Sequence, residues 1–132
     1  MGELDLLLDT DVLIDLLRQF PPALKCAEEN AALRIGIPVI TRLELIQGAR
    51  SQAEQAILIQ HLGIYPVIHL ETGDSQQALQ WFESLHLRSG ISIMDCLIAA
   101  IASRWQIPLC TFNTKHFASI PTLKALSPYS RT

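Results

Sequence analysis

Three acidic residues and one amide stand at positions of the sequence where they could act together on a substrate. Asp9 follows the apolar run Leu6–Leu8, where a predicted strand ends, and Glu44 lies in the helical turn after a second predicted strand. Asp95 lies in the first turn of a predicted helix, and Asn113 follows a fourth predicted strand. In a parallel sheet these positions can converge on the edge where ligands bind. We therefore predict one site that contains all four residues.

The chemistry expected of such a site is metal-dependent hydrolysis. Carboxylates that are brought together repel one another unless a cation neutralises them. Oxygen ligands suit Mg²⁺ or Mn²⁺, and a bound ion can activate water for phosphodiester hydrolysis. Asp9, Glu44 and Asp95 are therefore the predicted metal ligands. Zinc is disfavoured, because the four histidines of the chain show no paired ligand spacing.

The elements that must position these residues alternate along the chain. Short apolar runs predict strands, and apolar residues at helical spacing predict helices. The predicted strands are 4–8, 33–40, 65–70 and 108–111, with a short final strand at 123–126. The predicted helices are 11–19, one that starts at Pro21, 41–50, 53–62, 74–87 and 93–105. Strands separated by helices favour an α/β fold, with a parallel sheet covered on both faces.

Composition sets the outer bounds of the prediction. The 132 residues fit a single domain, 1–132, with 49% hydrophobic and 17% charged residues and a net charge of −3. No apolar run approaches the roughly 20 residues of a membrane span, and no secretory signal is visible. Three widely spaced cysteines favour free thiols in a reducing compartment. We expect a cytoplasmic protein that does not bind polyanions over its whole surface.

Each acid also has a local explanation that involves no ligand. Thr41-x-x-Glu44 has the pattern of a helix capping box, and Ser92-x-x-Asp95 resembles one. Asp11 could simply favour the positive end of its helix. Asp9 is the acid for which a helix-start role is least expected, because it follows three leucines and precedes the expected cap position.

Four segments together resemble the PIN-domain ribonucleases, specifically the VapC-type toxins of prokaryotic toxin–antitoxin pairs. The segments are LLLDTDVLI at 6–14, TRLELIQG at 41–48, GISIMDCLIAAIA at 90–102 and TFNTKHF at 111–117. They occur in the order found in that family and span nearly the whole chain. The resemblance implies a three-layer α/β/α fold, with a central parallel sheet of four to five strands. It also implies Mg²⁺- or Mn²⁺-dependent RNA cleavage, a homodimer and a VapB-type antitoxin that blocks the site.

By position in these motifs, Asp9, Glu44 and Asp95 correspond to the metal-binding acids of the family. The chain departs from the family in its last motif, which usually carries a fourth acid at the position of Asn113 or of His116. The site has therefore lost a negative charge, and we expect one tightly bound metal ion rather than two in the RNA-free enzyme.

The residues beside these acids are predicted to support the site or to contact RNA. Asn113 can orient a metal-bound water, and His116 can contact an RNA phosphate. Arg42 beside Glu44 and Lys115 beside Asn113 supply local positive charge for RNA. The remaining supporting residues, which lie next to the predicted acids or the last motif, are Thr10, Asp11 and Thr111.

Two alternative functions remain open from the sequence. The segment 9–13 also resembles the first motif of haloacid-dehalogenase-type phosphatases, in which the first aspartate is the nucleophile. That family's later Gly-Asp-x-x-x-Asp motif is absent, because Gly73-Asp74 is followed by Ser75, Gln76, Gln77 and Ala78. The second alternative is a non-catalytic interaction module that keeps only the fold.

Overall fold

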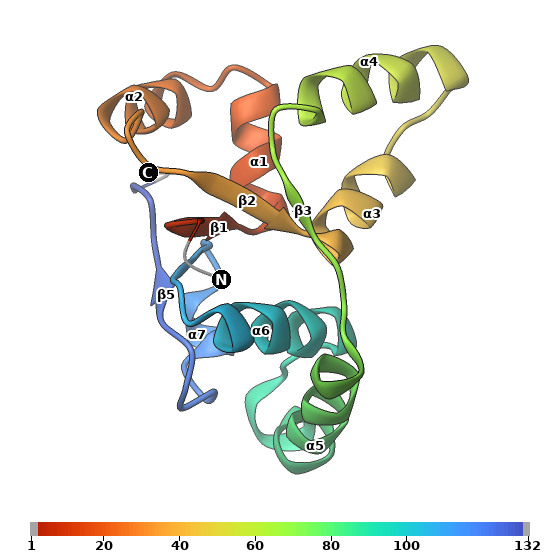
Figure 1. The fold of residues 1–132 in the computed structure, drawn as a ribbon, viewed down its shortest axis with the longest axis vertical. Helices are drawn as coiled ribbons and strands as arrows, with labels where there is room; N and C mark the ends of the chain where they lie inside the picture. The colour runs from red at the N-terminus through yellow and green to blue at the C-terminus, as the bar shows by residue number, and fades with distance from the viewer. Residues whose placement is uncertain (1–2, 131–132) are drawn as a thin grey trace.

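A five-stranded parallel sheet lies between two layers of helices in the computed structural model, which describes residues 3–130 (Figure 1). The strands follow the order β3-β2-β1-β4-β5, and every neighbouring pair is parallel. Their bounds are β1 Leu6–Leu8, β2 Ile35–Pro38, β3 Val67–Ile68, β4 Leu109–Cys110 and β5 Ala125–Leu126. The predicted fold class and the predicted number of strands are confirmed.

The helices are divided between the two faces of this sheet. Figure 1 shows α1 to α4 above the sheet and α5 and α6 below it. Their bounds are α1 Thr10–Leu17, α2 Pro21–Glu29, α3 Val39–Gln47, α4 Gln52–Leu62, α5 Thr72–Ser89, α6 Ile93–Trp105 and the short α7 Thr114–Phe117. No helix in this part of the chain is both long and apolar enough to cross a membrane.

The sheet separates two apolar cores. Neighbouring strand residues point to opposite faces, so Leu7 packs into one core and Leu8 into the other. The first core holds the buried face of α6, including Ile98 and Ile101, and the second holds the buried side of α1 with Leu13. A strand that is buried on both faces needs an unbroken apolar run, which explains the three leucines before Asp9.

The observed elements agree with the predicted ones in type and differ from them mainly at their ends. Helix α6 has the bounds predicted for it, and α2 starts at Pro21 as expected. The strands are shorter than predicted. The predictions follow runs of apolar residues, and these runs extend beyond the residues that pair with a neighbouring strand. Strand β3 shows this best: it lies at a sheet edge, pairs only with β2 and contains two residues of the predicted 65–70.

Helix α3 begins two residues earlier than predicted, at Val39, and this changes the role of Thr41. The N-cap residue is Pro38, which provides no side-chain hydrogen bond. Thr41 is completely buried inside the helix, and its hydroxyl donates to the carbonyl of Leu8 at 3.4 Å. The capping box considered for Thr41 and Glu44 is therefore wrong, and Glu44 needs another explanation.

Helix α5 also starts two residues early, for a reason that a search for serine and threonine caps misses. Glu71 is its N-cap, and Asp74 completes a capping box by accepting a hydrogen bond from the Glu71 amide at 2.9 Å. Asp74 is buried, and its carboxylate accepts a second contact from the Arg104 guanidinium of α6 at 2.9 Å. This ion pair joins the two helices that cover the lower face.

Candidate functional site

The site lies where the direction of chain winding reverses in the sheet. Strand β1 has β2 on one side and β4 on the other, so the chain leaves β1 in one direction and returns to it from the opposite side. At such a switch point the loops after the two central strands separate and open a crevice. Asp9 follows β1 and Thr111 follows β4, which puts both residues at this crevice.

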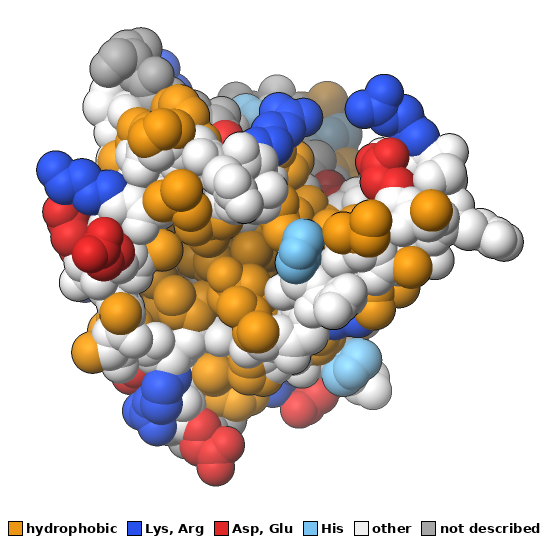
Figure 2. Space-filling view, turned by 90° about the horizontal axis from the view of Figure 1, so that it is seen from above, with side chains coloured by type: hydrophobic (Ala, Val, Ile, Leu, Met, Phe, Trp, Pro, Cys, Tyr) orange, Lys and Arg blue, Asp and Glu red, His pale blue; other side chains and the backbone are white. Residues whose placement is uncertain are grey.

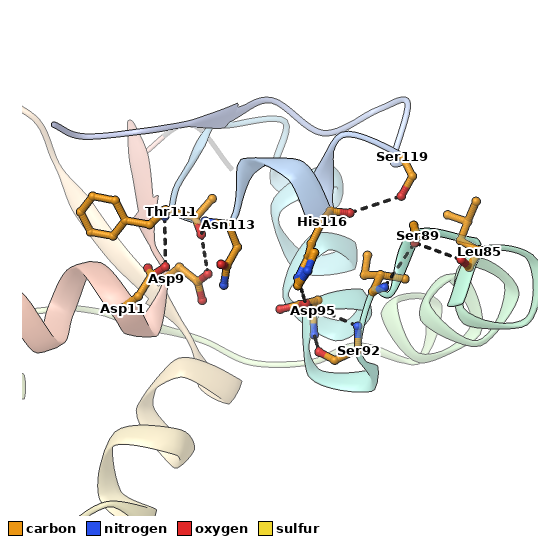
Figure 3. A network of polar contacts seen from close by, with 12 residues as sticks. Asp9, Asp11, Leu85, Ser89, Ser92, Asp95, Thr111, Asn113, His116 and Ser119 are labelled. Atoms are coloured by element: carbon orange, nitrogen blue, oxygen red, sulfur yellow. Dashed lines mark hydrogen bonds and ion pairs between the residues drawn. The ribbon is translucent and has the colours of Figure 1, made fainter. Parts of the chain in front are cut away.

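Asp9 is held from two sides although only 4% of it is exposed. One carboxylate oxygen, Oδ1, accepts from the backbone amide of Thr10 at 2.8 Å. The other, Oδ2, accepts from the Thr111 hydroxyl at 2.7 Å (Figure 3). Asp9 is thus also the N-cap of α1, which starts at Thr10 and not at residue 11 as predicted. The positive end of α1 stabilises the carboxylate.

The electrostatic surroundings of Asp9 are nevertheless unfavourable to its charge. Burial raises the pKa of Asp9 from its ordinary 3.8 to about 6. The charges of Asp11 and Asp95 raise this pKa further, and the hydrogen bonds from Thr111 and Thr10 lower it. Above pH 6 the folded protein therefore contains a buried carboxylate with other acids nearby, which is an arrangement that favours a cation.

Glu44 is linked to Asp9 by hydrogen bonds that both acids make with Thr10. The Thr10 hydroxyl donates to Oε1 of Glu44 at 2.8 Å, and its backbone amide donates to Asp9. One residue of α1 therefore contacts two of the three predicted acids. Glu44 is half-buried on α3, and its side chain is directed to the site instead of to its own helix end.

Asp95 has the helix-capping role considered for it and also faces His116. It completes the capping box of α6, because its amide donates to the Ser92 hydroxyl at 3.0 Å and its carboxylate accepts from the Ser92 amide at 3.4 Å. The same carboxylate lies 3.5 Å from Nδ1 of His116, and its charge raises the pKa of Asp9. The helix-start explanation is correct here without excluding a part in the site.

The segment after β4 carries the remaining predicted residues. The amide of Asn113 donates to the Thr111 hydroxyl at 3.0 Å, and His116 lies on α7 beside Asp95. In Figure 3 Asn113 stands between the Asp9–Thr111 pair and the Asp95–His116 pair. Helix α7, which was not predicted, brings His116 to this position.

Asp11 supports the site through a contact that the sequence did not reveal. Its Oδ2 accepts from the backbone amide of Phe112 at 3.1 Å, which ties the start of α1 to the segment after β4. No residue type signals such a backbone donor in advance. Of the two predicted RNA-steering cations, Arg42 is half-buried on α3 and Lys115 is exposed on α7.

The three predicted metal ligands have other partners in this structure. Within residues 3–130 no three Asp, Glu, His or Cys side chains are already arranged around a common metal position. Glu44 is bonded to Thr10, and Asp95 lies against His116. The donors are all carboxylates, which are ligands that Mg²⁺ and Mn²⁺ accept. Burial and neighbouring acids raise the pKa of Asp9, and a bound cation would offset both effects. Joint coordination requires Glu44 and Asp95 to turn toward Asp9.

Comparison with known proteins gives one family and a group of similar structures. Residues 6–123 match the sequence model of the PIN domain. A toxin-antitoxin complex from Klebsiella pneumoniae contains a chain that is 26% identical, with a TM-score of 0.74 over 96% of this chain and 99% of that chain. No curated protein sequence matches significantly.

Two further structures share the fold at lower identity. One is a DNA-bound VapBC from Salmonella typhimurium, 23% identical, with a TM-score of 0.78 over 96% of this chain and 99% of that one. The other is VapBC-1 from nontypeable Haemophilus influenzae, 24% identical, with a TM-score of 0.77 over 93% and 97%.

The raised pKa of Asp9 predicts how the stability of the metal-free protein depends on pH. The folded chain retains the Asp9 proton up to about pH 6, whereas the unfolded chain releases it near 3.8. The contribution of Asp9 to the free energy of unfolding therefore falls as pH rises from about 4 to 6. Asp9→Asn should be more stable than wild type at pH 8 by up to about 3 kcal/mol, and less so at pH 4.

Urea unfolding in the presence of a chelator at pH 4, 6 and 8 measures this difference. Asp5→Asn is the matched control: Arg34 lowers the pKa of Asp5, so Asp5 titrates below its ordinary 3.8 and the difference between this variant and wild type should stay nearly constant from pH 4 to 8. A difference between wild type and Asp9→Asn that stays constant from pH 4 to 8 would contradict the electrostatic description of Asp9.

Proposed function

The chain belongs to the PIN domain family, and from this premise we propose that it is a metal-dependent endoribonuclease that acts as the toxin of a toxin–antitoxin pair. The observation that carries the proposal is the buried Asp9 carboxylate at the switch point. Thr10 bonds to both Asp9 and Glu44, and the charge of Asp95 raises the pKa of Asp9. The similar structure from Klebsiella pneumoniae is described as a toxin–antitoxin complex, which supports the biological role.

Asp9, Glu44 and Asp95 are the proposed ligands of Mg²⁺ or Mn²⁺. When bound, the ion would polarise the scissile phosphate and lower the pKa of an attacking water. Thr111 and Thr10 hold the Asp9 carboxylate in one orientation, and the Thr10 hydroxyl keeps Glu44 near it. Asp9 is nearly inaccessible to solvent, so few water molecules can hydrogen-bond to its carboxylate in place of these partners.

Asn113, two cationic side chains and one histidine complete the proposed site. Asn113 is an exposed amide at the start of α7, and its side chain can hydrogen-bond to water or to a phosphate oxygen. Arg42 and Lys115 lie on helices that carry or flank the acids, and they supply positive charge on a chain with a net charge of −3. His116 on α7 can donate a hydrogen bond to an RNA phosphate. The phosphatase alternative loses its basis, because its first motif is the start of the matched PIN domain.

We also propose where the antitoxin binds. A groove of about 400 Å³ between α1, α3 and α4 has apolar lining from Ile14, Leu17, Leu45, Ile57 and Leu58. Its charged lining residues are the acids Glu44 and Glu54 and the cation Arg18. Figure 2 looks onto the face that carries α1, α2 and α4 and shows an apolar hollow at its centre. An antitoxin segment with apolar side chains would fill the groove, and an arginine or lysine on it would pair with Glu44 where the metal would otherwise bind.

RNA cleavage tests the catalytic assignment. Purified protein should cleave RNA in the presence of Mg²⁺ or Mn²⁺ and lose this activity in EDTA. Glu44→Gln and Asp95→Asn should each lower the rate at least about 100-fold, because even outer-shell partners of metal ligands contribute 10- to 100-fold. Glu83→Gln, which removes one exposed acid from α5, is the control and should cleave at the wild-type rate. Full activity in Asp95→Asn would refute the assignment.

Thermal unfolding tests the metal ligands without relying on activity. At 100 times its dissociation constant, Mn²⁺ should stabilise the folded protein by about 2.7 kcal/mol. Asp9→Asn, Glu44→Gln and Asp95→Asn should each remove most of this gain. If the Mn²⁺-induced increase in Tm survives all three substitutions, the ion binds elsewhere.

Antitoxin binding is tested with a VapB-type antitoxin, which is to be sought in the reading frame next to this chain's gene. Ile57→Glu should weaken binding at least about tenfold, because a charge would enter an apolar contact. Ile57 is 56% exposed in the free protein, so the substitution should leave the fold intact. Leu87→Glu on α5, at a residue that is 89% exposed, is the control. An affinity that is unchanged by Ile57→Glu and by excess Mn²⁺ would exclude this groove.

A further inference from the structure

The end of the described chain folds back toward the site. Strand β5 pairs with β4, and the Thr111 amide donates to the Leu126 carbonyl at 2.8 Å. Beyond β5, the carbonyl of Pro128 accepts from the Cys26 thiol at 3.7 Å. The next residue, Tyr129, donates its hydroxyl proton to Oδ2 of Asp15 on α1 at 2.8 Å. This tail therefore contacts β4, α1 and α2.

The ring of Tyr129 touches two other aromatic rings. Its centroid lies 5.2 Å from that of Phe112, in an edge-to-face arrangement with an interplanar angle of 73°. It lies 6.2 Å from the ring of Phe20, just before α2, at an angle of 48°. Both arrangements are of the tilted kind that aromatic pairs prefer. Tyr129 thus joins the α1–α2 connection to the segment after β4.

Phe112 has a central position in the site although its side chain does no chemistry. It stands between Thr111, which donates to Asp9, and Asn113. Its own amide donates to Asp11. Any change in the backbone at Phe112 would therefore move Thr111 and Asn113 relative to Asp9.

Helix α1 anchors this arrangement at two points on one face. Asp11 and Asp15 are four residues apart, so their side chains lie one turn apart on the same side of the helix. Asp11 accepts from the Phe112 amide, and Asp15 accepts from the Tyr129 hydroxyl. The Phe112 segment is therefore held from the backbone side by Asp11 and from the ring side by Tyr129.

We propose that Tyr129 is a positioning residue: its ring clamps Phe112 and thereby keeps Thr111 and Asn113 in register with the Asp9 carboxylate. This inference rests on the proposed nuclease function, because it assigns Tyr129 a role in that same site. Tyr129 itself contacts none of the three predicted acids in the described structure. Its effect on the reaction passes through Phe112.

Hydrogen exchange of the Phe112 and Asn113 amides tests this role in the full-length protein. In Tyr129→Ala both amides should exchange about tenfold faster than in wild type, because two aromatic contacts are lost. In Tyr129→Phe, which keeps the ring and loses only the hydroxyl, exchange should stay within about threefold of wild type. The Ile37 amide in the central sheet should be unaffected in both variants.

Tyr65→Ala is the matched control. Tyr65 is the other tyrosine of the chain, is also half-buried and precedes β3 at the opposite edge of the sheet. Its removal should leave the exchange of the Phe112 and Asn113 amides unchanged. With RNA and Mg²⁺, Tyr129→Ala should lower kcat about tenfold with KM within about threefold, since a misplaced site slows the chemical step more than binding.

The exchange measurement decides the inference independently of activity. Equal Phe112 and Asn113 exchange in wild type and Tyr129→Ala would overturn it, and so would equally fast exchange in Tyr65→Ala. If Tyr129→Ala does not fold, Tyr129→Leu takes its place, because it keeps apolar bulk without a ring and should give the same acceleration. Absence of RNA cleavage by wild type, together with faster exchange in Tyr129→Ala, would refute the proposed function and leave the clamp in place.

Discussion

The burial of the Asp9 carboxylate is the constraint on which the rest of the site depends. A charged group that is 4% exposed must be compensated, and here the compensation comes from an amide, a hydroxyl and the positive end of α1. The pKa of Asp9 is still raised to about 6, which shows that these partners do not compensate the charge fully. A carboxylate with this residual charge favours a cation beside it.

The same contacts connect the site to the fold. Thr10 opens α1 and bonds to Glu44, and Thr111 follows β4 and bonds to Asp9. Asp95 begins α6 and is a member of its capping box. In each case a residue that terminates or starts an element also positions a residue of the proposed site. The local roles of Asp9 and Asp95 at their helix starts are therefore compatible with the roles proposed for them in the site.

Two features were outside the reach of local sequence patterns. Helix α3 starts at Val39, so Thr41 lies within it, and the Thr41 hydroxyl donates to Leu8 of the neighbouring strand. The apparent capping box with Glu44 therefore does not form. The Phe112 amide and the Tyr129 ring became visible only in the folded chain. In both cases a long-range contact took precedence over the local preference of the residue.

The sequence by itself determined the alternation of strands and helices, the bounds of α6 and which polar residues stand at the ends of strands. These properties depend on periodicity and residue type within about 20 residues, where apolar spacing is informative. The tertiary structure decided which of those strand ends meet. The Thr10–Glu44, Asp9–Thr111 and Asp15–Tyr129 bonds join residues 34, 102 and 114 positions apart. Such contacts follow from the strand order β3-β2-β1-β4-β5, which places β4 beside β1, and no local pattern encodes that order.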